Sequence, residues 1–190
     1  MKNLMTSIRL TLVLVVLLCV VYPIVIASAG KLSKGKGDGE TVSVNGKVVG
    51  YANEGQSFTQ QKYFWGRPSA VGYNAAGSAG SNKGPSNPDY LKDVAGRIDT
   101  LLKYHPYLKR SDIPAEMVTA SGSGLDPDIS PEAAKIQIKR IAEVRGLSVE
   151  QVTKLVDAHT EAPLLGMFGP AKVNVLKLNV GLDELAKPAK

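Results

Sequence analysis

Hydrophobic residues are concentrated at the amino end of the chain, and shorter amphipathic segments follow. From Leu10 to Gly30 there are 21 consecutive residues without a charge. A helix rises about 1.5 Å per residue, so this run can cross the hydrocarbon core of a bilayer, which is about 30 Å thick. We therefore expect a membrane-spanning helix over residues 10–30, preceded by a short N-terminal cap over residues 1–9.

A cleaved signal peptide is the alternative for this segment. Its basic start, Pro23 and the small triplet Ala27-Ser28-Ala29 fit the pattern of a cleavage site. The apolar core Leu10–Ile26 has 17 residues, which is longer than usual for a signal peptide and favours an uncleaved anchor. Positive residues flank the run on both sides, so the positive-inside rule does not choose an orientation.

The remaining sequence predicts one soluble α+β domain over residues 41–190, joined to the anchor by a flexible tether over residues 31–40. The tether is rich in glycine and lysine. Directly after it, Thr41–Gly50 places Asn45-Gly46 between pairs of valines, which is typical of a β-hairpin with a two-residue turn.

Helical patterns dominate the second half. We expect a helix over Asp89–Tyr104 that Asn87 or Ser86 caps, because apolar residues recur on one face, at Leu91, Val94, Ile98, Leu101 and Leu102. Ser130-Pro131 predicts the start of a second helix that ends at Gly146, and Ser148 with Gln151 predicts the capping box of a third. Alternation over Lys172–Val180 predicts a closing strand.

Between the hairpin and the first of these helices lies a segment of unusual composition, Gly66–Pro88. Of its 23 residues, 15 are Gly, Pro, Ser or Asn, so neither a regular helix nor a central strand fits it. A disordered linker is one interpretation. An ordered loop that contacts a partner is the other, and the length of the segment favours it, since long structureless loops are uncommon within compact domains.

Charge and cysteine content exclude several classes. The net charge is +6, of which Lys2 and Arg9 contribute two in a segment without acids, and the rest is dispersed rather than gathered in a basic stripe with interleaved aromatics. Nucleic-acid binding is therefore not expected. Cys19 is the only cysteine, so no intrachain disulfide can form.

Catalytic motifs are incomplete. Ser121–Asp126 invites comparison with a nucleophile elbow, and Ser123 could be combined with His159 and Asp126 into a triad, but a serine replaces the first glycine of the elbow. Gly35-Lys36-Gly37 lacks the spacing of a phosphate-binding loop. With two distant histidines, neither a catalytic nor a metal site is predicted. A secreted or anchored hydrolase using Ser123 and an extracytoplasmic ligand-binding module remain alternatives.

A family resemblance adds to this picture. Phe64–Ala70, Tyr73–Asn82, Gly84–Pro88, Val118–Asp126 and Val173–Asn179 closely resemble the KdpC family, which forms part of the Kdp potassium-transporting P-type ATPase. The resemblance covers the chain from the anchor to the carboxyl end. It implies a single-pass protein of the cell membrane with its soluble domain outside the cytoplasm.

The resemblance also implies partners and a role. The partners would be a potassium-channel-like subunit, an ATP-hydrolysing P-type subunit, a small stabilising peptide and membrane lipid, with potassium as the cargo of the complex. The chain would not be the enzyme; it would serve assembly and act as a catalytic chaperone that raises the ATP affinity of the pump subunit. Either an external domain braces the channel-like subunit, or the Ser/Gly loops with Arg67 or Arg140 contact an ATP shared with the pump subunit. The first mechanism is favoured because neither loop contains a phosphate cradle.

Contact residues carry over from matching positions. Candidates for contact with a partner or nucleotide are Phe64, Gly66, Arg67, Pro68, Tyr73, Asn74, Ser78, Ser81, Asn82, Asn87, Ser121, Ser123 and Asp126. The sequence departs from the family pattern at Asp128, where a histidine is expected, and at Ala162-Pro163, where a basic residue is usual. More than half of the candidates are expected to form hydrogen bonds that merely hold the loops together.

Overall fold

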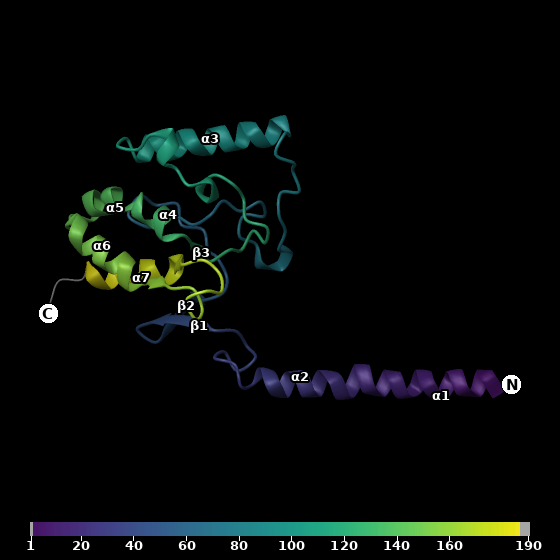
Figure 1. Ribbon diagram of the computed structural model, residues 1–190. Coiled ribbons are helices and arrows are strands. Elements are labelled where there is room, and N and C mark those ends of the chain that lie inside the picture. The colour runs from purple at the N-terminus through teal and green to yellow at the C-terminus, as the bar shows by residue number, and fades with distance from the viewer. Residues whose placement is uncertain (1, 187–190) are drawn as a thin grey trace. The chain divides into compact units, whose positions relative to one another are not determined.

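The computed structural model describes residues 2–186 (Figure 1). It divides into two compact units, one that ends at Thr41 and one that begins at Val42. The first unit contains the apolar helix and the second contains every other helix and nearly all of the strand residues.

The first unit is one continuous helical rod. It consists of α1 (Lys2–Val16), a π-helical turn η1 (Leu17–Val21) and α2 (Tyr22–Gly30), which together are long and apolar enough to cross a membrane. The Tyr22 amide donates to the Leu17 carbonyl, one residue further back than in an α-helix. The wider turn directly precedes Pro23, whose ring would otherwise press on the carbonyl four residues earlier. Residues 31–38 continue as a series of hydrogen-bonded turns.

The predicted hairpin is confirmed. Strands β1 (Thr41–Val44) and β2 (Lys47–Tyr51) form a two-stranded sheet. The turn residues Asn45 and Gly46 both have positive φ, at 51° and 77°. A two-residue turn of this kind matches the right-handed twist of the strands, and Asn-Gly adopts it at little cost.

A second sheet and four helices form the centre of the domain. Short strands β3 (Asp128–Ile129), β5 (Lys172–Asn174) and β4 (Thr160–Glu161) pair antiparallel in that order. The registers place Ile129 and Thr160 on either side of Val173. Helices α4 (Pro131–Lys135), α5 (Ile138–Arg145), α6 (Val149–Ala158) and α7 (Val175–Leu185) pack nearby, and α3 (Pro88–Tyr104) lies apart from them (Figure 1).

Most helix boundaries agree with the sequence prediction. Asn87 caps α3 by accepting the Tyr90 amide at 3.1 Å, Ser130 caps α4, and Ser148 with Gln151 forms the capping box of α6. Gly146 ends α5 in the left-handed conformation at φ 64°. The expected apolar face of α3 is only partly right, because Ile98 and Leu101 are buried whereas Leu91 is exposed.

Two predictions are wrong in detail. The closing strand expected over Lys172–Val180 stops at Asn174, and α7 follows it as a helix that the three-helix prediction did not include. The Asn174 side chain accepts the Lys177 amide at 3.0 Å, so it starts a helix instead of continuing the strand. The helix expected from Ser130 to Gly146 is divided into α4 and α5 around Ile136 and Gln137.

One hydrophobic core joins these elements. Its largest fully buried apolar side chains are Phe64, Ile129, Ile141, Leu178, Leu182, Val152, Val156 and Val173. They come from the segment before the glycine-rich loop, from β3 and β5, and from α5, α6 and α7. The core therefore fixes Phe64 at the point where the glycine-rich loop begins.

Candidate functional site

The glycine-rich loop is an ordered structure that lies against the segment Val118–Asp128. The Pro68 carbonyl accepts the Ser121 amide at 3.1 Å, and the Ser69 and Ser78 hydroxyls donate to the carbonyls of Gly124 and Ser123 at 2.7 and 2.9 Å. We call this contact between residues 66–80 and 121–128 the two-loop junction. Its hydrogen bonds fix the loop, so the prediction of an ordered loop is confirmed for these residues.

Ser69 and Tyr73 organise the first half of the loop. The Ser69 hydroxyl oxygen accepts the amides of Val71 and Tyr73 at 3.2 and 2.9 Å while it donates across the junction. Tyr73 has a positive φ of 60°, and its hydroxyl donates back to the Arg67 carbonyl. Burial raises the pKa of the Tyr73 phenol, and the Asp126 carboxylate adds to this. The phenol therefore stays protonated and serves as a donor that closes the turn.

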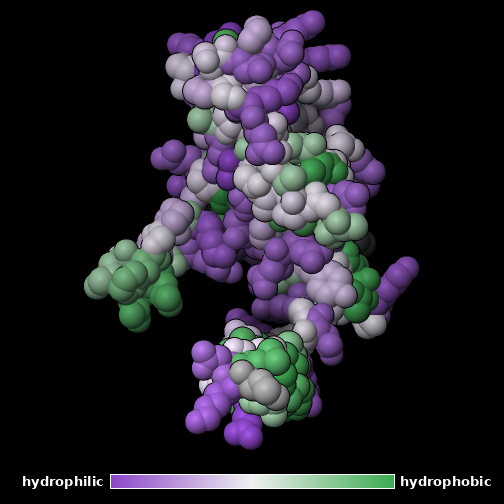
Figure 2. All heavy atoms as spheres, turned by 90° about the vertical axis from the view of Figure 1, so that its right-hand side faces the viewer, coloured by the Kyte–Doolittle hydropathy of each residue, from purple (hydrophilic) through white to green (hydrophobic). Residues whose placement is uncertain are grey.

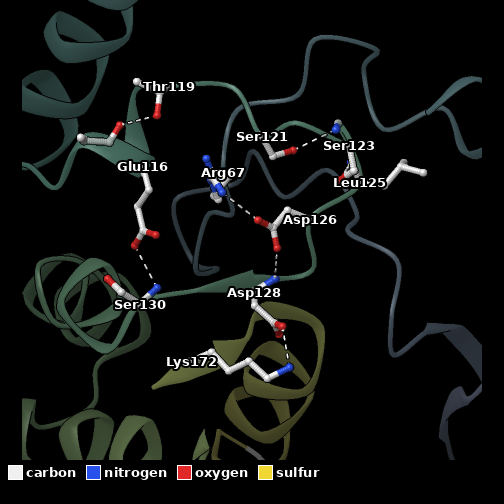
Figure 3. A network of polar contacts seen from close by, with 12 residues as sticks. Arg67, Glu116, Thr119, Ser121, Ser123, Leu125, Asp126, Asp128, Ser130 and Lys172 are labelled. Atoms are coloured by element: carbon white, nitrogen blue, oxygen red, sulfur yellow. Dashed lines mark hydrogen bonds and ion pairs between the residues drawn. The ribbon is translucent and has the colours of Figure 1, made fainter. Parts of the chain in front are cut away.

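A line of charged groups runs along one side of the junction (Figure 3). Arg67 Nη1 lies 2.9 Å from Asp126 Oδ2, and Asp126 Oδ1 accepts the Asp128 amide at 3.1 Å. Lys172 Nζ in turn lies 2.8 Å from Asp128 Oδ2. The hydrogen bond to Asp128 raises the pKa of Lys172, with smaller contributions from the charges of Asp128 and Glu161. Each cation pairs with one of two neighbouring carboxylates, so Asp126 holds the glycine-rich loop and Asp128 holds strand β5.

Ser121 and Ser123 hold the second loop together from within. The Ser121 hydroxyl, which is buried, accepts the Gly124 amide at 2.9 Å, and the Ser123 hydroxyl accepts the Leu125 amide at 3.0 Å. His159 instead contacts the Leu155 carbonyl through Nδ1. Within the described chain, no hydrogen bond joins any two of Ser123, His159 and Asp126, so this geometry does not assemble the triad.

The other candidate residues have separate roles. Phe64 lies in the core, and Asn179 bridges its amide and carbonyl at 2.8 and 3.0 Å. Asn74 caps the short turn Ala75–Gly77, and Asn87 caps α3. Ser81 and Asn82 lie on the exposed part of the loop, where Asn82 has a φ of 53°. The structure therefore brings together Gly66, Arg67, Pro68, Tyr73, Ser78, Ser121, Ser123 and Asp126, whereas Phe64, Ser81, Asn82 and Asn87 lie outside the two-loop junction.

An open pocket of about 420 Å³ adjoins the junction. Aromatic and aliphatic side chains form much of its wall, and Gly66, Arg67, Pro68 and Tyr73 also line it. From α3 it receives Arg97, whose Nη1 donates to the Val118 carbonyl at 2.9 Å. Among residues 2–186 no group of three or more His, Cys, Asp or Glu side chains is placed to hold a metal.

Arg140 lies inside the domain, where it is not accessible to a nucleotide. Only 2% of it is exposed. Its Nε donates to His105 Nε2 at 2.9 Å, its Nη2 donates to Gln137 Oε1 at 2.8 Å, and its Nη1 donates to the carbonyls of Gln61 and Tyr63. The guanidinium also lies 4.3 Å from the centre of the Trp65 ring. With these donors engaged and the group buried, Arg140 holds the core together.

Burial controls the ionisation of this cluster. It lowers the pKa of His105 to about 4, and the positive charge of Arg140 acts in the same direction. It also lowers the pKa of Arg140 to about 10. At neutral pH, His105 is therefore a neutral acceptor for a charged Arg140, and its Nδ1 faces the Leu101 carbonyl at 2.8 Å.

Several organising residues were not predicted from the sequence. Ser69 lies within the segment that carries the family resemblance, so its motif could have drawn attention to it. Gln137, which bonds both the amide and the carbonyl of Trp65, and His105 gave no signal, because an isolated polar residue in a helical pattern does not reveal that it is buried. Only the folded chain shows that these side chains meet.

The fold and the site define a class of protein: a single helix able to span a membrane, attached to a small α+β domain in which a glycine-rich loop is hydrogen-bonded to a second loop. A family model described as "K+-transporting ATPase, c chain" matches residues 4–184. The chain is 57% identical over 188 residues to a "Potassium-transporting ATPase KdpC subunit" of Bacteroides fragilis, covering 97% of this chain and 98% of the relative. It is 60% identical to that of Flavobacterium johnsoniae over 97% and 100% of the two chains.

A more distant relative agrees. The protein of the same name from Caldanaerobacter subterraneus subsp. tengcongensis is 49% identical over 97% of this chain and 96% of its own. The chain belongs to the KdpC family of K+-transporting ATPases. It is an accessory subunit, with catalysis in another subunit, and the predicted resemblance is confirmed.

Proposed function

We propose that the domain lies outside the cytoplasm, anchored by one membrane helix, and braces the channel-like subunit of the potassium-transporting complex. The observation that carries this proposal is the two-loop junction. It holds an exposed glycine-rich loop in one conformation, so that Asn74, Ser78, Ser81 and Asn82 present polar groups without the loss of freedom that a disordered loop would suffer on binding. The other proposed neighbours are the P-type subunit, the small stabilising peptide and lipid. The tether over residues 31–40 links the anchor to the domain.

In this proposal the effect on ATP affinity is exerted through the partner subunits. Binding to one conformation of the complex shifts its population toward that conformation, which changes ATP affinity without contact between this domain and the nucleotide. A directly contacted, shared ATP is the competing mechanism. The burial of Arg140 and the pairing of Arg67 with Asp126 favour the indirect one, because neither cation is free to meet a phosphate.

The loop contact is tested with glycines whose added side chain would meet open space. A side chain at Gly77 in the loop, or at Gly96 on α3, has no atom of the domain within 4 Å of its Cβ. Gly77→Trp should therefore fold and block a partner that docks on the loop, whereas Gly96→Trp is the matched control. We expect co-purification of the other subunits from mild detergent to fall severalfold for Gly77→Trp alone. Equal recovery with both variants would remove the loop from the interface.

The side of the membrane is tested by labelling. In a Cys19→Ser background, Ser111→Cys places a single thiol on an exposed turn far in sequence from the loop. An impermeant maleimide should label it in intact cells. Labelling only after the cells are opened would place the domain in the cytoplasm and overturn the bracing mechanism.

A further inference from the structure

Between β4 and β5 the chain forms an exposed apolar tip that the proposed function does not use. The ten residues from Ala162 to Ala171 contain no polar side chain. Leu164, Leu165, Met167 and Phe168 are 69%, 77%, 74% and 59% exposed. Figure 2 shows a hydrophobic lobe that stands out from the body of the domain at the end of a narrow arm. We call residues 162–171 the apolar tip.

The tip is a folded turn rather than a loose loop. Leu164 and Phe168 exchange backbone hydrogen bonds at 3.0 and 2.9 Å, the Gly166 amide donates to the Pro163 carbonyl, and the Met167 amide donates to the Leu164 carbonyl. Leu165 adopts a positive φ of 54°, which a branched side chain rarely does. The backbone hydrogen bonds of the turn hold Leu165 in this strained conformation, in which its side chain is exposed at the surface.

The base of the tip is fixed to the domain. Strand β4 pairs with β5 through Glu161 and Lys172, the two charged residues that bound the apolar segment. Lys172 lies 2.8 Å from Asp128 and 3.7 Å from Glu161. The flanking charges are thus engaged at the base, and the tip itself presents apolar side chains alone.

These features suit a lipid surface better than a protein surface. A specific protein interface of ordinary size uses about one hydrogen bond per 100–200 Å², and the tip has no side chain that can supply one. A bilayer offers no such hydrogen bonds, so backbone groups that enter it must already be hydrogen-bonded within the protein. Four backbone amides of the tip donate to carbonyls of the tip. The chain also has an N-terminal helix that is long and apolar enough to cross a membrane, and the ten-residue tether limits the start of the domain to about 35 Å from it.

We propose that the apolar tip inserts into the interfacial region of the bilayer that holds the N-terminal helix, giving the domain a second membrane contact. Leu165 and Met167 enter deepest, because they are the most exposed. Since no basic residue lies within residues 162–171, the contact depends on apolar burial and is insensitive to ionic strength and to anionic lipid. It depends on the anchor but on no partner subunit.

The test uses the full chain reconstituted without partners in phosphatidylcholine vesicles. With Cys19→Ser, an environment-sensitive fluorophore is attached at Met167→Cys or, as control, at Ser111→Cys. We expect blue-shifted emission and severalfold stronger quenching by brominated lipid at position 167 than at position 111, with weaker quenching by iodide. Adding Leu165→Asp should abolish this difference, and raising the salt concentration or adding anionic lipid should not change it.

Two results would overturn the proposal. If iodide and brominated lipid quench the fluorophore at position 167 to the same extent as at position 111, the tip stays in water. In the purified complex, protection from iodide without lipid quenching would show that the tip docks on a protein. Because the vesicle experiment contains no other subunit, its failure leaves the bracing proposal, which is tested by Gly77→Trp, unaffected.

Discussion

Arg140 is a buried cation that no carboxylate balances within residues 2–186. Its charge is stabilised by carbonyl oxygens, by the Trp65 ring and by the neutral ring of His105. A desolvated charge is tolerated only when its hydrogen bonds are complete. Protonation of His105 would remove an acceptor and set two positive charges side by side, so the protonation state of one histidine controls the cluster.

The contact between neutral His105 and charged Arg140 predicts a pH dependence of stability. The pKa of His105 is lowered from 6.5 to about 4 in the fold, chiefly by burial. As the pH falls from 6.5 to 4, the unfolded chain binds a proton that the native domain does not, so stability falls, by about 3 kcal/mol in total. His105→Gln keeps an acceptor without the titration. Urea unfolding in detergent, followed by Trp65 fluorescence, should show a smaller loss for His105→Gln over this range; parallel curves would contradict the argument.

The two-loop junction predicts unequal costs for two neighbouring glycines. Gly124 has a φ of 68°, and a Cβ there would lie 2.6 Å from Val71 Cγ2 and 2.8 Å from the Ala79 carbonyl oxygen. At Gly122 a Cβ would meet nothing within 4 Å. Gly124→Ala should lower the free energy of unfolding by about 2–4 kcal/mol through backbone strain and overpacking. Gly122→Ala is the control, and similar urea midpoints for the two variants would mean that the loops do not pack as described.

At the scale of elements, local signals predicted best where the local chain decides the structure. The Asn45-Gly46 turn, the Asn87 cap and the Ser148/Gln151 capping box all act within a few residues, and each was predicted correctly. The segment after Lys172 was not, because its alternating residues suit a strand as well as a helix. Tertiary contacts decide the outcome: the Asn174 amide group donates to the Ala52 carbonyl at 2.7 Å while its oxygen caps α7.

In the candidate site, too, the sequence identified residues but not their tertiary contacts. The resemblance identified Arg67, Tyr73, Ser121 and Asp126, and the structure joins them in one network, but their spacing alone could not show which of them pair. The apolar tip was not predicted at all. A short apolar run in a sequence suggests a core segment, and only the fold shows that Leu165 faces outward.

At the scale of the whole molecule, the chain combines two units that are stabilised by different solvents. The domain depends on burying Phe64 and its neighbours away from water, whereas the helix of 29 residues exposes its apolar side chains and satisfies its backbone internally. Urea weakens the stability that the domain gains by burying apolar side chains. It has little access to the backbone hydrogen bonds of a helix that lies in an apolar medium. The two units should therefore unfold separately.

Full-length protein in detergent micelles tests this separation. Urea should abolish the fluorescence signal of Trp65, the only tryptophan, in one transition, because that ring lies against Arg140 in the domain. Helical circular dichroism should fall in the same transition to a plateau that corresponds to the 29 residues of the apolar helix. Loss of all helical signal together with the fluorescence would mean that the helix depends on the domain. The anchor would then be a part of the fold. The domain would not be able to reach a lipid surface or a partner independently of the helix.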